Sequence, residues 1–464
     1  MKKYLITCIA FSIFALKLGA QGYQSTYGSP YAGSTAIKNN PASSINSAFK
    51  WDLTLFTAQA RVSTNSLHMR NDSVLLNSGY RSRFLHNNVD ISLFNILYKP
   101  NNKHAFAFNL RARSYNHVRT APLFASDTIY SIHDFVQQNR TTPYLEGFVT
   151  HSGWLQGDFN YATILSENHN SRLTGGVTLQ VMKNISGAYT RINKLSYLEA
   201  HNATDTLYTF VTGGGSFGYS SNYDETASGT SSSTKDFLKN TLTNFGLSLG
   251  VEYLLYEEKT NSYQQNNSLN YQWKIGVALM DIGANKYKSS EFSSQFRNID
   301  PGITDIVMDQ KFTNIQNGRD LRDSLATVFT NADSVNKQFK IGSPTRLILN
   351  IDRSFGNNLY INADLNINLH GTSDYKRLLT REINLLTITP RWETLNWGFY
   401  LPVQYNSQGQ FHIGAAFKAG PLVLGVHNLQ WAKQIKNLSG GGYLMLSIHP
   451  FNKKRVISKL DCPE

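Results

Sequence analysis

The clearest hydrophobic pattern of the chain lies in residues 359–369. Leu, Ile or Ala occupies every odd position of this stretch, whereas the even positions carry Tyr, Asn or Asp. A period of two predicts a β-strand with one apolar and one polar face. Eleven residues is also the length that a tilted strand needs to cross a bilayer, and soluble sheets usually have shorter strands. The stretch therefore favours a membrane strand over one face of a soluble β-sandwich.

Similar alternation recurs along most of the chain and is bounded by turn residues, which predicts fourteen strands, an even number. The predicted strands cover residues 51–62, 89–99, 104–114, 154–165, 172–183, 242–257, 271–281, 345–354, 359–369, 382–391, 396–405, 411–418, 422–429 and 442–451. The turn Gly356-Asn357-Asn358 between two of them suits a tight reversal of the chain. We expect neighbouring strands to pair antiparallel.

The first eight connections between these strands alternate in length. The long ones cover residues 63–88, 115–153, 184–241 and 282–344, and the short ones cover residues 100–103, 166–171, 258–270 and 355–358. Outer-membrane barrels show this asymmetry, with short periplasmic turns and long external loops. The sequence thus predicts an all-β fold, a transmembrane antiparallel up-and-down β-barrel of about 14 strands over residues 49–451. Within the long loops we expect an extra hairpin at 205–219 and a short helix at 320–329.

The two ends of the chain differ from the barrel. Residues 1–20 have the features of a signal peptide, with Lys2-Lys3 before an apolar stretch and Ala20 at the expected cleavage site. Residues 21–48 are rich in Gly, Ser, Asn and Pro and contain Asn40-Pro41-Ala42. They form either a flexible leader or a plug-like segment in the mouth of the barrel. Residues 452–464 are a basic tail that suits the periplasmic rim.

The composition excludes a helical membrane protein and is compatible with a barrel. The chain of 464 residues is 41% hydrophobic, and its mean hydropathy of −0.33 resembles that of soluble proteins. Beyond the N-terminus no uncharged apolar run approaches eighteen residues. A barrel escapes this test because polar residues facing its interior dilute the apolar ones, and the 25 Tyr and 26 Phe suit aromatic girdles at both interfaces.

The net charge indicates which partners to expect, and the number of cysteines decides whether a disulfide can form. The net charge is +13, and it falls to +10 once the three lysines of residues 1–20 are removed. In an exported protein we expect this surplus to meet outer-membrane lipid and lipopolysaccharide, and we expect no nucleic acid partner. Removal of Cys8 with the signal peptide leaves Cys462 alone, so no intramolecular disulfide can form.

Four stretches of the second half carry a family resemblance. They are Gly-Val-Ala-Leu-Met-Asp-Ile-Gly at 276–283, Thr-Pro-Arg-Trp-Glu at 389–393, Trp-Gly-Phe-Tyr-Leu-Pro-Val at 397–403 and Gly-Pro-Leu-Val-Leu-Gly at 420–425. In this order they resemble a Bacteroidota domain-of-unknown-function family of outer-membrane β-barrels, which is similar to the FadL/PorV group of fourteen-stranded barrels. Asn40-Pro41-Ala42 is similar to the Asn-Pro-Ala signature near the start of FadL-type proteins, although Ser43-Ser44-Ile45 replaces the usual Gly-Leu pair after it. The resemblance implies location and fold, and it implies no substrate.

Catalytic and metal-binding motifs are missing from the sequence. It contains no P-loop, HExxH, paired CxxC, nucleophile elbow or dinucleotide fingerprint. His133-Asp134 and Glu257-Glu258 are adjacent pairs, and adjacent side chains of a strand point to opposite faces. The twelve His have no metal-ligand spacing. We therefore expect no enzyme, no cofactor and no metal site.

The polar positions of the alternating strands are the best candidates for a functional surface. The side chains that we expect to line the lumen are Asn109, Arg111, Arg113, Asp158, Asn160, Glu252, Asp352, Asn362, Asp364, Asn366 and Asn368. They form either a network of polar side chains that satisfy one another or a selectivity surface along a ligand path.

Three functions are compared. The first is FadL-like passive transport of a small compound, which can be hydrophobic, by diffusion through the lumen, gated by the plug and without an energy cofactor. The second is a PorV-like anchor, shuttle or structural barrel for exported or surface proteins. The third, a β-rich periplasmic enzyme, needs convergent carboxylates in a cleft and finds no support in the sequence.

Overall fold

A computed structural model describes residues 23–70, 73–201, 206–224, 234–256, 271–371, 377–429 and 437–449. The predicted signal peptide (1–20), the basic tail (452–464) and the pair Glu257-Glu258 lie outside these residues. Within the described ranges, no helix combines the length and the apolar character needed to cross a membrane.

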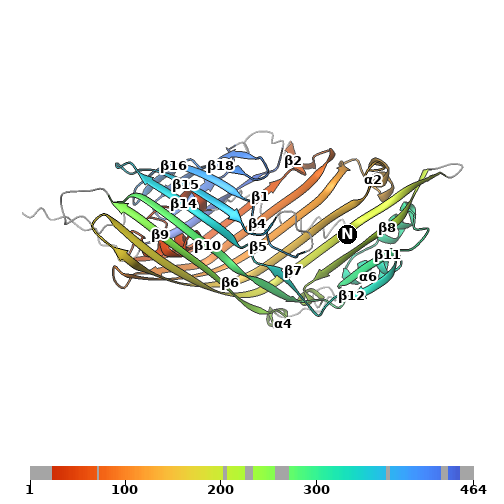
Figure 1. The fold of residues 1–464 in the computed structure, drawn as a ribbon, viewed down its shortest axis with the longest axis horizontal. Helices are drawn as coiled ribbons and strands as arrows, with labels where there is room; N and C mark the ends of the chain where they lie inside the picture. The colour runs from red at the N-terminus through yellow and green to blue at the C-terminus, as the bar shows by residue number, and fades with distance from the viewer. Residues whose placement is uncertain are drawn as a thin grey trace, which may run out of the picture.

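Fourteen antiparallel strands close into a tilted barrel (Figure 1). Closure occurs at β1, which pairs with β4 on one side and with β22 on the other. In order around the wall the strands are β1 (Trp51–Thr64), β4 (Gly79–Tyr98), β5 (His104–Ala125), β6 (Leu145–Glu167), β7 (Ser171–His201), β9 (Thr243–Tyr256), β10 (Tyr271–Lys288), β14 (Arg346–Ser354), β15 (Leu359–Asn368), β16 (Leu385–Glu393), β17 (Trp397–Tyr400) with β18 (Val403–Asn406), β19 (Phe411–Ile413) with β20 (Ala415–Ala419), β21 (Leu422–Val426) and β22 (Gly440–Ile448). Each predicted strand corresponds to one of these, so the predicted fold is confirmed.

Two of the wall strands are interrupted. Leu401-Pro402 separates β17 from β18, and both of these strands pair with β16. Proline has no N–H to donate to the neighbouring strand, which explains the break. Gly414 separates β19 from β20 in the adjacent wall strand.

The alternation of the sequence corresponds to the two faces of the wall. On β9 the side chains of Leu249 and Val251 are exposed, whereas Ser248 and Glu252, which flank this pair, are buried. The exposed face is apolar because it meets lipid, and the buried face is polar because it meets the barrel interior.

The prediction of long external loops is wrong for a large part of their residues, which belong to the sheet. The strands β4, β5, β6 and β7 have 20, 22, 23 and 31 residues, whereas a tilted strand needs only about 9–11 to cross a bilayer. They continue past one end of the barrel (Figure 1). Main-chain hydrogen bonds hold these outer parts together, so they do not need the strict apolar alternation by which membrane strands are recognised.

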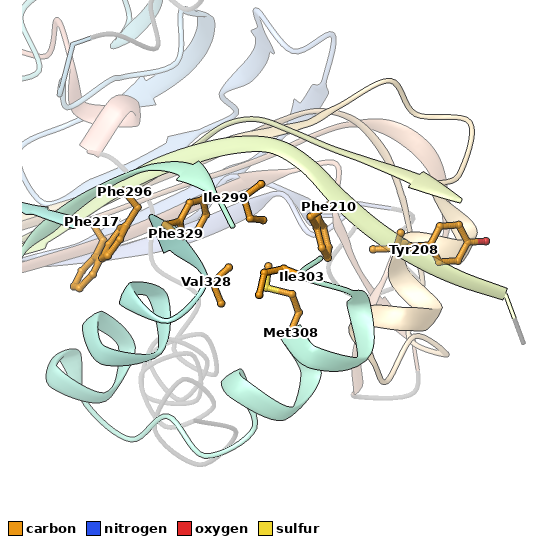
Figure 2. Close-up of a cluster of buried hydrophobic side chains, with 10 residues drawn as sticks. Tyr208, Phe210, Phe217, Phe296, Ile299, Ile303, Met308, Val328 and Phe329 are labelled. Atoms are coloured by element: carbon orange, nitrogen blue, oxygen red, sulfur yellow. The ribbon is translucent and has the colours of Figure 1, made fainter. Parts of the chain in front are cut away.

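The end of the barrel beyond which these strands continue carries a structured extension. Its elements are β8 (Thr206–Tyr219), β11 (Ser294–Ile299), β12 (Phe329–Ser334), β13 (Gln338–Gly342), α2 (Ile132–Gln138), α5 (Asp305–Phe312) and α6 (Gly318–Ala326). The expected hairpin within 205–219 is wrong, because residues 206–219 form the single strand β8, which pairs with β7. Helix α6 lies where a helix was expected. A core that includes Phe210, Phe296 and Met308 fills the space between strands and helices (Figure 2). Minor elements are β2 (Leu67–Arg70), β3 (Ser73–Leu76), η5 (Ser221–Tyr223) and α4 (Thr234–Lys239).

The N-terminal segment, residues 23–48, contains three short 3-10 helices. They are η2 (Tyr23–Thr26), η3 (Gly33–Lys38) and η4 (Pro41–Ser44). Pro41 occupies the first position of η4, and the Asn40 side chain caps this helix by accepting a hydrogen bond from the Ala42 N–H. Most described side chains of the segment are buried against the inner face of the wall. The described part of the segment therefore packs against the inner face of the wall.

Candidate functional site

Polar contacts join the N-terminal segment to opposite parts of the wall. The Ser34 hydroxyl donates to Thr54 of β1 at 3.0 Å, and Ser44 donates to Asn160 of β6 at 2.7 Å. On the other side, Asn39 donates to Asp364 of β15 at 3.1 Å, and Ser29 donates to Glu393 of β16 at 2.6 Å. The segment also contacts β4, β7, β9 and β22. It thus bridges the interior of the barrel.

Two glycines of the wall allow the main chain of the N-terminal segment to lie directly against the strands. A Cβ at Gly250 of β9 would lie 2.0 Å from Oδ1 of Asn40, and one at Gly176 of β7 would lie 2.4 Å from the carbonyl carbon of Pro41. Asn40 also donates to the main-chain carbonyl of Val251 at 3.0 Å. The Asn-Pro-Ala stretch therefore fits a part of the wall that lacks side chains.

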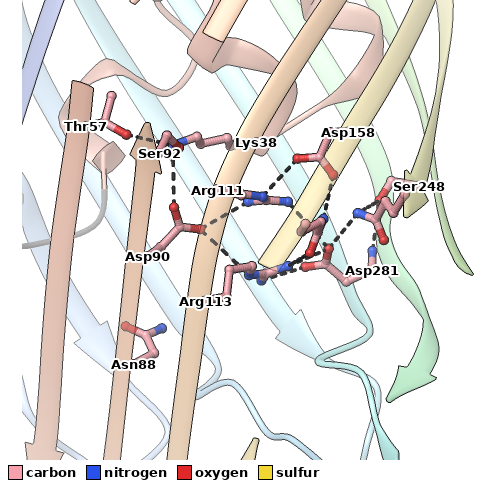
Figure 3. Close-up of polar contacts among 12 residues, drawn as sticks. Lys38, Thr57, Asn88, Asp90, Ser92, Arg111, Arg113, Asp158, Ser248 and Asp281 are labelled. Atoms are coloured by element: carbon pink, nitrogen blue, oxygen red, sulfur yellow. Dashed lines mark hydrogen bonds and ion pairs between the residues drawn. The ribbon is translucent and has the colours of Figure 1, made fainter. Parts of the chain in front are cut away.

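A group of buried charges lies beside the segment. We call Lys38, Asp90, Arg111, Arg113, Asp158 and Asp281 the central cluster (Figure 3). Arg111 lies 3.1 Å from Asp90 and 2.9 Å from Asp158. Arg113 donates two hydrogen bonds to the Asp281 carboxylate, at 2.9 and 3.0 Å. Buried charges persist when opposite charges and hydrogen bonds compensate them, and the central cluster meets this condition.

Lys38 brings the N-terminal segment into this cluster. Its Nζ lies 3.5 Å from Oδ1 of Asp90 and donates to the hydroxyls of Thr57 and Ser92. Burial lowers the pKa of Lys38 to about 8, although the Asp90 carboxylate acts in the opposite direction. Lys38 is thus mainly protonated at neutral pH and ties η3 to β4 through an ion pair.

A second cluster lies between β14 and β20 and contains Asp352, Arg391, Glu393 and Lys418. Arg391 is fully buried and donates to both oxygens of Asp352, at 2.6 and 2.9 Å. Its Nε lies 3.2 Å from Glu393, which also lies 3.6 Å from Lys418. Ser29 of the N-terminal segment donates to the same Glu393. Both charged clusters therefore contact the segment.

The structure buries nearly all the side chains that the sequence analysis singled out. Arg111, Arg113 and Asp158 meet in the central cluster, and Asp352 belongs to the second one. The others that contact the N-terminal segment are Asn160, Glu252 and Asp364. Asn362 bonds Asn350 and Asp352. Asn109 and Asn366 are buried, and Asn368 is partly buried and donates to the His370 carbonyl.

Several charged residues of these clusters escaped the sequence analysis. Asp90 lies between Val89 and Ile91, and the neutral Ser92 continues the same alternation. The period of two could therefore have placed both polar side chains inward. Asp281 gave no such signal. It has a φ of +57° at a point where the register of β10 against β9 shifts, so a local irregularity turns it inward. Lys38 belongs to a segment without a period.

A polar cavity lies between the N-terminal segment and the wall. Its empty space, opening included, is about 480 Å³. Its lining residues are Tyr27, Lys38, Gln59, Arg61, Asn88, Asp90, Arg111, Arg113, Tyr115, Arg346, Asn366 and Glu382. Arg346 lies 3.4 Å from Glu382 and 3.7 Å from Asp281, which connects the cavity to the central cluster. Among the residues that the structure describes, no group of His, Cys, Asp or Glu is arranged to hold a metal ion.

The chain is similar in fold to several solved structures of low sequence identity. The toluene transporter TbuX of Ralstonia pickettii has 11% identity and a TM-score of 0.40, with 90% of this chain and 94% of that chain covered. A FadL homologue of Pseudomonas aeruginosa has 12% identity and a TM-score of 0.41, with 93% and 97% covered. A mutant of the monoaromatic hydrocarbon channel TodX has 11% identity and a TM-score of 0.44, with the same coverage.

No curated protein matches the chain in sequence. One family model does match, and it spans residues 28–426. This range begins inside the N-terminal segment and includes nearly the whole barrel wall. The chain therefore belongs to the family of unknown function DUF5723.

Proposed function

We propose that this protein is a passive outer-membrane channel for a small compound, with the N-terminal segment as its gate. The observation that carries the proposal is the bridge of hydrogen bonds from residues 29–44 to opposite sides of a polar interior. Each of these contacts can be exchanged for a contact with water, because both partners are polar. Movement of the segment would therefore leave a pore that water can wet.

The attachment of the segment supports a gating role. Residues 23–48 join the wall covalently only through the start of β1 at Trp51. All their other contacts to the wall are non-covalent. Ile37 and Ile45 pack in an apolar cluster with wall residues such as Leu97, and Tyr27 packs against a second cluster of wall residues that includes Tyr443. The segment can thus leave the interior without unpairing a strand.

The lining favours a polar solute over the hydrophobic compound that the analogy with FadL-type transport allowed. The cavity and both clusters line the interior of the barrel with carboxylates, guanidinium groups and amides. A hydrophobic molecule would desolvate these groups without replacing their hydrogen bonds, which is unfavourable. A small polar molecule can replace these hydrogen bonds, so its diffusion avoids the cost of desolvation.

The outer membrane is the proposed location, with lipid and lipopolysaccharide as partners. Support comes from the exposed apolar residues on the wall, among them Phe245, Leu249 and Val251 of β9. Barrels of this kind expose a continuous apolar band to lipid. A protein anchor is the second candidate function, and the observation in its favour is the extension with its own core, which enlarges the outer end of the barrel.

A disulfide that locks the segment to the wall tests the gate. The hydroxyl oxygens of Ser34 and Thr54 lie 3.0 Å apart, so two cysteines at these positions would bring their sulfurs close to bonding distance. We expect Ser34→Cys/Thr54→Cys, in a Cys462→Ser background, to conduct in planar bilayers under reducing conditions. Oxidation should abolish this conductance, and reductant should restore it.

A matched control disulfide lies within the wall. The hydroxyl oxygens of Thr54 and Ser447 are also 3.0 Å apart, and they join β1 to β22. Thr54→Cys/Ser447→Cys should conduct equally in the oxidised and reduced states, because this bond leaves the segment free. A variant that lacks residues 23–48, and that still shows the heat-modifiable mobility of a folded barrel, should conduct continuously. Its failure to conduct would contradict the channel and favour the anchor.

A further inference from the structure

Arg61 is a buried cation whose charge no neighbouring carboxylate neutralises by direct contact. It lies on the inner face of β1, its exposed fraction is 9%, and it lines the polar cavity. Among the described residues it forms no hydrogen bond and no ion pair. Burial of an unpaired charge is costly, so a site of this kind is typically completed by a counter-ion.

The strand register explains why Arg61 has no partner in the wall. On β4 it lies opposite Asn88, and on β22 it lies opposite Gly441. Glycine contributes no side chain, and the Asn88 amide is neutral. Asn88 donates instead to Glu382, at 3.2 and 3.3 Å. Neither neighbouring strand therefore supplies a carboxylate at this level.

The other charges around the cavity compensate one another. The cations are Lys38, Arg61, Arg111, Arg113 and Arg346, and the carboxylates are Asp90, Asp158, Asp281 and Glu382. Each carboxylate lies within ion-pair distance of at least one cation other than Arg61. Among these cations Arg61 is the one without a carboxylate at ion-pair distance in the described part of the chain.

Neutral groups of the same cavity also lack partners. The amide oxygens of Gln59, Asn88 and Asn366 accept no hydrogen bond within the described part of the chain. Buried polar atoms are nearly always hydrogen-bonded, so unpaired ones beside an empty space indicate a polar occupant. Gln59 precedes Arg61 by two residues on the same face of β1.

We propose that this cavity binds one small oxyanion, a carboxylate or a phosphate, through the guanidinium group of Arg61. The planar guanidinium offers two parallel N–H donors to such a group, which is the strongest arrangement available to an arginine. Both oxyanion classes share this chemistry. The proposal rests on Arg61 of the wall, so it does not depend on whether the barrel conducts.

Isothermal titration of the detergent-purified mature protein tests the site, with sodium acetate and inorganic phosphate as probes in a chloride buffer. We expect saturable binding at one site, and the tighter of the two probes identifies the class of oxyanion. Arg61→Gln should weaken this binding at least ten-fold. Arg61→Lys keeps the charge without the fork of donors and should weaken it less, and it serves as the test if Arg61→Gln does not fold.

A second buried arginine provides the control. Arg83 is 6% exposed and donates to the main-chain carbonyls of Gly79 and Ala125, outside the cavity. Arg83→Gln removes the same charge and should leave oxyanion binding unchanged. Binding that never saturates in the unmodified protein, or that falls equally in Arg83→Gln and the Arg61 variants, would overturn the proposal.

Discussion

At the scale of single residues, the interior of this barrel is held by ion pairs whose partners come from distant strands. Arg391 of β16 and Asp352 of β14 are both fully buried, and two hydrogen bonds join them. The Tyr271 hydroxyl also donates to Asp352. Removing one partner of such a pair leaves an uncompensated charge, which costs much more than the pair itself contributes.

Arg391→Met should therefore lower the free energy of unfolding by about 3–5 kcal/mol. The measurement is urea unfolding in lipid vesicles, followed by tryptophan fluorescence. Arg297→Met is the control, because the ion pair of Arg297 with Asp333 is exposed and should contribute less than about 1 kcal/mol. Equal effects of the two substitutions would show that the interior pair is accessible to water.

At the scale of elements, each wall strand has a lipid face and an interior face, and β9 shows both clearly. Val251 lies near the middle of β9 with 43% of its side chain exposed. Leu198 lies on β7, in the part that pairs with β8 in the extension, and is 64% exposed. Exposure alone does not distinguish these two residues, but their surroundings do, because one meets lipid and the other meets water.

Val251→Arg should lower the free energy of unfolding by about 2–4 kcal/mol, the cost of an arginine at the bilayer midplane. Leu198→Arg should change it by less than about 0.5 kcal/mol, as for an ordinary surface position. The same unfolding measurement in vesicles compares the two. A small effect at Val251 would mean that β9 does not face lipid there.

At the scale of the whole molecule, the two ends of the barrel differ. One end carries the extension, and the other has short turns such as the one between β4 and β5 (Figure 1). The extension folds around its own apolar core, which contains Tyr208, Phe217 and Phe329 (Figure 2). This asymmetry predicts a single orientation in the membrane, with the extension outside the cell.

Cysteine labelling of whole cells tests this orientation. Val211 on β8 is 48% exposed, and Asn102 in the turn between β4 and β5 is exposed. In a background without native cysteines, Val211→Cys should react with a membrane-impermeant maleimide on intact cells. Asn102→Cys should react only after the outer membrane is permeabilised, and the reverse pattern would contradict the orientation.

The sequence by itself determined the membrane part of the barrel. A strand between lipid and a polar interior must alternate, as in residues 359–369, and this local rule is readable without any knowledge of neighbours. The inward direction of Arg111, Arg113 and Asp158 follows from the same rule. In the part of β7 that pairs with β8, a strand has no need to alternate between apolar and polar residues. The sequence therefore predicted loops where the structure has strands.

Only the tertiary structure decided which inward residues meet. Arg391 and Asp352 are 39 positions apart, and Ser34 reaches Asp52 and Thr54 only because the N-terminal segment folds back inside the wall. Asp281 faces inward through a backbone irregularity that no periodicity encodes. The solitary charge of Arg61 depends on the register that sets it opposite Gly441, and register is a property of closure. Contacts across a closed barrel join residues that are remote in the chain, so no local pattern can specify them.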